Sequence, residues 1–72
     1  MEIELFGQLA KERQSIHVET FPQPMTVLEL AEKLDLDLGL VGLISIDGKS
    51  SHWSDKVNNE NRVCFFPYLE GG

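Results

Sequence analysis

The stretch "TVLELAEKL", residues 26–34, predicts one well-capped amphipathic helix in the middle of the chain. Thr26 is a suitable N-cap residue, and Glu29 follows three positions later to complete a capping box. Four apolar residues recur at the i, i+3, i+4 and i+7 positions of a single stripe: Val27, Leu30, Ala31 and Leu34. We therefore expect a helix from about Val27 to Leu34 that packs one face against a core.

The segments before the helix, "EIELF" (residues 2–6) and "SIHVETF" (residues 15–21), alternate apolar and polar residues with the period of strands. In the second segment, Ile16 and Val18 fall on the apolar face and His17 on the polar face. Two prolines follow it and cannot donate to a strand ladder, so they end the second strand. We expect an N-terminal hairpin whose connection, "GQLAKERQ", is longer than a tight turn.

Beyond the helix, the segment "DLDLGL", residues 35–40, is interpreted as a connection. The mostly apolar run "LVGLISID" that follows ends in Asp47-Gly48, a strong signal for a two-residue hairpin turn. We expect this turn to lead into a short strand near residues 49–51.

The polar stretch "DKVNNEN", residues 55–61, predicts a turn or loop, and "RVCFFPY", residues 62–68, predicts the last strand. Alternation places two side chains on each face of that strand: Val63 and Phe65 on one, Cys64 and Phe66 on the other. Cys64 is interpreted as a small buried residue.

The resulting order, ββαβ(β)β, predicts an α+β fold in which two hairpins flank one helix. We expect a mixed sheet of four to five strands curled over one main helix, the β-grasp or ubiquitin-like architecture. The alternative is a small barrel, which a single capped helix in mid-chain disfavours. With 72 residues the chain is one domain, predicted to comprise residues 1–67, and residues 68–72 are predicted to form a flexible C-terminal tail.

The composition of the chain argues against three classes of function: nucleic-acid binding, metal binding and membrane insertion. Six basic residues against twelve acidic ones give a net charge of −6, which disfavours nucleic acid and suits a basic protein partner or simply solubility. The single Cys64 and the two widely separated histidines do not predict a metal site. The apolar runs are too short for a membrane span and no signal peptide is evident, so we expect a cytoplasmic protein without a membrane partner.

The sequence does not predict a stand-alone enzyme. No nucleophile–base pair, carboxylate pair or phosphate-binding loop can be identified, because Gly39 and Gly42 lack the spacing and the lysine of a P-loop. His52, beside Trp53, is interpreted as an ordinary loop residue.

The last two residues, Gly71 and Gly72, suggest chemistry of a different kind. Glycine has no Cβ, so this end of the chain can pass through a channel too narrow for other residues. A terminal carboxylate, with an ordinary pKa of about 3.5, is ionised at neutral pH and can attack an activated phosphate. Pro67 marks the point where strand pairing should stop. The alternative is that the two glycines are a frayed end or a cloning remnant.

The stretch "RVCFFPYLEGG", residues 62–72, resembles the C-terminus of the small subunits of molybdopterin synthase, within the MoaD/ThiS sulfur-carrier family. The shared pattern is a valine, two apolar or aromatic residues, a proline and the terminal glycines, and it is filled here by Val63, Phe65, Phe66, Pro67, Gly71 and Gly72. The start of the chain, "IELFGQLAKER", is also similar to the first strand and turn of that family. Tyr68 departs from it, because the molybdenum branch commonly has a second proline there.

This resemblance implies a carrier rather than a catalyst. An E1-like adenylyltransferase would use ATP to adenylate the carboxylate of Gly72, next to Gly71, and a sulfur donor protein would convert it to a thiocarboxylate. The sulfur would then pass to the large subunit of molybdopterin synthase or to another sulfur-accepting synthase. This chain itself would bind no cofactor. The expected docking residues are Phe66, Pro67, Leu69 and Phe6.

Three other interpretations remain open. They are a carrier for thiamine thiazole synthesis, a ubiquitin-like modifier conjugated to lysines through Gly72, and a non-catalytic interaction domain. Plain core packing is the alternative for each docking residue.

Overall fold

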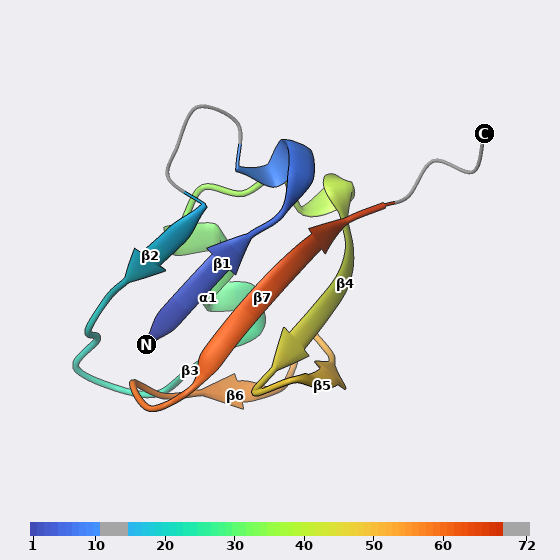
Figure 1. Cartoon of the computed structure of the whole chain (residues 1–72). Coiled ribbons are helices and arrows are strands. Elements are labelled where there is room, and N and C mark those ends of the chain that lie inside the picture. The colour runs from blue at the N-terminus through green and yellow to red at the C-terminus, as the bar shows by residue number, and fades with distance from the viewer. Residues whose placement is uncertain (11–14, 69–72) are drawn as a thin grey trace.

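The computed structural model describes residues 1–10 and 15–68, which form a mixed five-stranded sheet with one α-helix packed on its inner face (Figure 1). The strand order is β2-β1-β7-β4-β5, and a separate two-stranded sheet pairs β3 with β6. The bounds are β1 Glu2–Leu5, β2 Ile16–Val18, β3 Met25–Thr26, α1 Val27–Lys33, β4 Val41–Ile46, β5 Lys49–Ser51, β6 Lys56–Val57 and β7 Arg62–Pro67. Short 3-10 turns η1 and η2 span Gly7–Leu9 and Leu38–Leu40.

The two central strands, β1 and β7, come from opposite ends of the chain and run parallel to one another. The other neighbours in the five-stranded sheet pair antiparallel. The predicted α+β class and mixed sheet are confirmed. The arrangement is compatible with the predicted β-grasp.

Helix α1 begins with the predicted capping box. The Thr26 hydroxyl accepts a hydrogen bond from the Glu29 N–H at 3.1 Å, and Glu29 Oε1 accepts one from the Thr26 N–H at 3.0 Å. The second bond lowers the pKa of Glu29, because it stabilises the carboxylate form.

At its other end, α1 closes one residue earlier than predicted, with Leu34 as its C-cap. Asp35 then takes a positive φ of 57°. The Leu36 N–H donates to the Ala31 carbonyl and the Asp35 N–H to the Glu32 carbonyl, each at 3.1 Å. These two bonds make a Schellman motif, which satisfies carbonyls that the helix leaves unpaired.

The core lies between α1 and the inner face of the sheet. Its largest fully buried side chains are Phe65, Ile3, Leu5, Leu30, Val27, Val57 and Val63. Val63 and Phe65 therefore point inward, as the alternation of β7 predicts. Cys64 is on the outer face and is only 8% exposed, which confirms it as a small buried residue.

In β2 the predicted orientation is wrong. Ile16 and Val18 are 48% and 81% exposed, whereas His17 is half-buried. The cause is the register with β1, which sets His17 directly opposite the core residue Ile3. Directly opposed residues project from the same face of a sheet, so His17 faces inward and its apolar neighbours face outward.

The stretch predicted as a loop, residues 55–61, contains strand β6. Met25 pairs with Val57 across β3 and β6, and Val57 is 1% exposed. Burial of this one valine anchors an otherwise polar stretch to the core. The hairpin at Asp47-Gly48 is confirmed, with positive φ angles of 51° and 83° at its two central residues.

Candidate functional site

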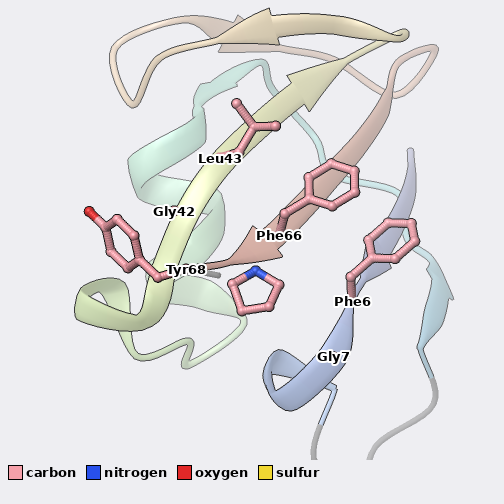
Figure 2. A pocket seen from close by; sticks show the side chains of 7 residues that line it. Phe6, Gly7, Gly42, Leu43, Phe66 and Tyr68 are labelled. Carbon is pink, nitrogen blue, oxygen red and sulfur yellow. The ribbon is translucent and has the colours of Figure 1, made fainter. Parts of the chain in front are cut away.

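Phe6 and Phe66 stack on one another at the C-terminal end of β7. Phe6 follows β1, Phe66 lies in β7, and the parallel pairing of these strands brings the two rings together. Their centroids are 4.4 Å apart and their planes differ by 12°. Both side chains are half-buried, so the stacked pair is partly exposed on the outer face of the sheet (Figure 2).

An apolar hollow of about 510 Å³ surrounds this pair. It is lined by residues from the ends of three neighbouring strands and from η1: Phe6, Gly7, Gly42, Leu43, Phe66, Pro67 and Tyr68. Leu43 and Tyr68, on its rim, are 48% and 61% exposed. The hollow can accept apolar side chains of another molecule, because partly exposed aromatic residues around a concavity are typical anchors in protein interfaces.

Two glycines let the end of β7 lie this close to its neighbours. A Cβ added to Gly42 would lie 2.9 Å from the Tyr68 Cα, and one added to Gly7 would lie 3.0 Å from the Pro67 Cγ. The Tyr68 N–H also donates to the Leu40 carbonyl at 3.1 Å. Pro67 and Tyr68 are thus held between η1 on one side and β4 on the other.

The position of Gly42 follows from an irregularity in the sheet. The register of β4 against β7 shifts between Val41 and Leu43, which pair with Pro67 and Phe66. This is the pattern of a β-bulge, which leaves Gly42 between the two pairs and bends the strand. In Figure 2 the ring of Tyr68 lies on the opposite side of β4 from Phe66.

Next to the hollow, β1 and β7 carry a cluster of three charged side chains on the outer face. Arg62 Nη2 lies 2.6 Å from Glu4 Oε1, and Arg62 Nε lies 3.5 Å from Glu2 Oε1. The hydrogen bond to Glu4 raises the pKa of Arg62, which remains a cation at any physiological pH. The apolar hollow therefore differs from this neighbouring charged cluster.

The structure brings three of the predicted docking residues together: Phe6, Phe66 and Pro67 all line the hollow. Pro67 is the last residue of β7, as predicted. Leu69, Gly71 and Gly72, the remaining predicted site residues, lie outside the described residues.

Sequence reasoning missed Leu43, Gly42 and Gly7. Leu43 stands in an apolar run that reads as uniformly buried, and only its pairing with Phe66 places it on the outer face. The one available signal for the glycines is that Gly42 interrupts this run, since glycine inside a strand pattern often marks a bulge.

Other polar groups have structural roles. The His52 N–H donates to Asp55 Oδ2 at 2.9 Å, and the Ser51 hydroxyl donates to the Lys49 carbonyl at 2.9 Å. Within residues 1–10 and 15–68, no three His, Cys, Asp or Glu side chains are grouped so as to hold a metal ion. No helix in the same part of the chain is long and apolar enough to cross a membrane.

The sequence matches no protein-family model, and comparison with curated proteins gives no significant match.

Proposed function

We propose that this protein is a cytoplasmic sulfur carrier, whose Gly72 carboxylate is adenylated and converted to a thiocarboxylate for molybdopterin synthesis. The observation that carries the proposal is the apolar hollow around Phe66, at the point where β7 ends and the segment with Gly71 and Gly72 begins. A docking surface and a reactive group on one short stretch of chain are what a protein-borne substrate requires.

The reach of the segment suits this role. The six residues from Pro67 to Gly72 span up to about 20 Å when extended. That length carries a terminal carboxylate from the sheet into the active site of another protein. Gly71 and Gly72 have no side chains to obstruct a narrow channel.

The chemistry needs no catalytic group from this chain. A carboxylate oxygen of Gly72 attacks the α-phosphorus of ATP, the bond to the β-phosphate breaks, and pyrophosphate leaves. A sulfide equivalent from a sulfur donor protein then attacks the acyl carbon, and AMP leaves with its electron pair. An E1-like adenylyltransferase supplies the residues for the first step, and this chain supplies the nucleophile and the docking surface.

Docking on the hollow gives the partner enzymes a means of recognition. Phe66 and Phe6 present apolar area with few rotatable bonds, so little conformational entropy is lost on binding. The activating enzyme and the large subunit of molybdopterin synthase would use this same surface in turn, because each must receive the same C-terminal segment.

Intact-mass spectrometry tests the proposal. The full chain is incubated with ATP, a sulfur donor and the adenylyltransferase of the same organism. The expected product is heavier than the starting protein by the exchange of one oxygen for one sulfur. A variant without Gly72, and one with an alanine added after it, should give no product, because each moves the carboxylate by about 3.5 Å. Conjugates on lysine would indicate a modifier instead, and an unchanged mass would contradict both functions.

The pathway is tested separately. The thiocarboxylate form is mixed with the large subunit of molybdopterin synthase and a pterin precursor, or with a thiazole synthase and its substrates. We expect loss of the sulfur, seen as return to the starting mass, only in the first mixture. Loss only in the second would assign the carrier to thiamine synthesis.

A further inference from the structure

Strand β2 lies at one edge of the five-stranded sheet (Figure 1), and its apolar side chains face solvent. Ile16 and Val18 are 48% and 81% exposed. An antiparallel strand over a core normally does the reverse and turns its apolar residues inward. Here the inner position holds His17, whose buried Nε2 has no hydrogen-bond partner among the described residues.

The backbone of β2 is also oriented for a further strand. The Leu5 N–H donates to the Ser15 carbonyl at 2.7 Å, and the Glu19 N–H donates to the Met1 carbonyl at 2.9 Å. Hydrogen-bonded and non-bonded pairs alternate along an antiparallel ladder. Ser15, His17 and Glu19 therefore face β1, and the N–H and C=O groups of Ile16 and Val18 point toward the free edge.

The opposite edge of the sheet is different. Strand β5 carries an exposed lysine, Lys49, followed by two serines. Lysine on an edge strand opposes the addition of further strands, because pairing would bury its charge. Strand β2 has no charged residue, so of the two edges it is the one able to accept a partner.

The charges beside β2 indicate what kind of strand it accepts. On the outer face Glu2 is opposite Val18 and Glu4 is opposite Ile16, and both carboxylates contact Arg62. Arg62 offsets one of these two negative charges, so the outer face beside β2 keeps a single net negative charge, which selects only weakly for a charged strand. An uncharged strand with β-branched side chains fits best, and β2 is such a strand itself.

We propose that β2 pairs antiparallel with β2 of a second copy of this chain, about a two-fold axis at His17. Ile16 then lies opposite Val18 of the second copy, and the two residues exchange the hydrogen bonds that point outward in the monomer. The four β-branched side chains form one apolar cluster on the outer face. The pairing joins the two five-stranded sheets edge to edge.

Repulsion between the two acidic chains is small in this arrangement. The glutamates on β1 of the two copies are three strand spacings apart, about 14 Å. The Debye length at physiological ionic strength is about 8 Å, so these charges are screened. The hollow around Phe66 lies at the end of β7, beyond β1, and remains open in the dimer.

A strand of three residues buries less than the roughly 1,200 Å² of a stable interface, so the dimer is weak. We expect a dissociation constant on the order of 0.1–1 mM. Sedimentation equilibrium of the full chain, from about tenfold below to tenfold above this range, should show a concentration-dependent rise toward the dimer mass.

Val18→Lys tests the edge, because it places a charge where pairing would bury it. Ser50→Lys makes the same charge change at an exposed position of β5 and is the matched control. We expect Val18→Lys to stay monomeric at every concentration, Ser50→Lys to associate like the wild type, and all three to melt at similar temperatures. NOEs between methyls of Ile16 and Val18 in mixed labelled and unlabelled protein should establish the register.

A wild type that sediments as a monomer throughout would overturn the proposal. So would association that survives Val18→Lys but is lost in Phe66→Ala, since the copies would then meet at the hollow. Neither result depends on sulfur chemistry, so this proposal and the proposed function fail independently.

Discussion

Phe65 and Phe66 are neighbours in the chain with different surroundings, and this allows docking to be separated from stability. The side chain of Phe65 is fully buried in the core on the inner face of the sheet, whereas that of Phe66 stacks on Phe6 in the partly exposed hollow on the outer face. Phe66→Ala should lower the free energy of unfolding by about 1–2 kcal/mol, through lost stacking and some burial. It should weaken binding to the activating enzyme by about 2 kcal/mol or more, about thirtyfold, if Phe66 is an anchor.

The matched control is Phe65→Ala, which removes the same side chain from the core and should cost about 3–5 kcal/mol of stability. Calorimetric titration and thermal unfolding of both variants make the comparison. An affinity unchanged in Phe66→Ala, together with a stability loss as large as that of Phe65→Ala, would place Phe66 in the core and contradict a docking role.

Substitution of Gly42 should have an effect confined to the end of β7. In Gly42→Ala the new methyl group meets the backbone of Tyr68, which no change of rotamer can relieve. We expect a loss of about 1–3 kcal/mol of stability and faster hydrogen exchange at the Tyr68 N–H, which donates to Leu40. Hydrogen exchange followed by NMR measures that amide directly.

Gly39→Ala is the control for this experiment. Its new methyl group would lie 3.4 Å from Asp37 Oδ1, an ordinary contact, and its φ is not in the positive range. It should change stability by less than about 1 kcal/mol and leave the Tyr68 amide unaffected. Equal effects of the two substitutions would mean that Gly42 has no special part in holding the end of β7.

At the scale of single elements, the end of helix α1 is a place where the sequence is not optimal. Asp35 occupies the left-handed position of the Schellman motif, with φ at 57°, where glycine is favoured. Its carboxylate also lies near the negative end of the helix dipole. Asp35→Gly should therefore raise the free energy of unfolding by about 0.5–1 kcal/mol, measured by urea denaturation.

Asp37→Gly is the comparison that separates this effect from a general effect of glycine. Asp37 has a φ of −78°, and its side chain accepts a hydrogen bond from the Gly39 N–H at 3.1 Å. Replacing it gives no relief of strain and loses that bond, so the variant should be less stable than the wild type. If both variants are destabilised, backbone strain at Asp35 is not significant.

For the molecule as a whole, the features predicted correctly from sequence are those with local signals. The capping box of Thr26 and Glu29 and the Asp47-Gly48 turn each depend on a few adjacent residues. The orientation of β2 depends instead on its register with β1, which alternation alone does not specify. β6 was missed because Val57 is a single apolar residue in a polar stretch and pairs with a distant segment.

The candidate site was predictable to a similar extent. Phe66 and Pro67 were identified from the resemblance of the last strand to a carrier family, and Phe6 from its place beside them. The contributions of Leu43 and Gly42 arise from a bulge between β4 and β7, and a register shift has no signature in either strand alone. The sequence therefore predicts the residues that β1 and β7 contribute to the hollow, whereas the contribution of β4 follows only from strand pairing.

The acid stability of the whole molecule should depend on Asp47, which joins the turn of the β4–β5 hairpin to the start of β7. Its carboxylate accepts hydrogen bonds from the Arg62 N–H at 2.8 Å and from Asn61 Nδ2 at 2.6 Å, and these bonds lower its pKa below the ordinary 3.8. A lowered pKa in the folded state means that the contribution to stability is fully present above pH 3.8 and is lost as the pH falls through the folded value. Asp47→Asn should therefore be less stable than the wild type at pH 7, and the difference should shrink steadily below pH 3.8. Urea denaturation at a series of pH values measures this difference, and a gap that stays constant into the acid range would show that the charge of Asp47 does not stabilise the fold.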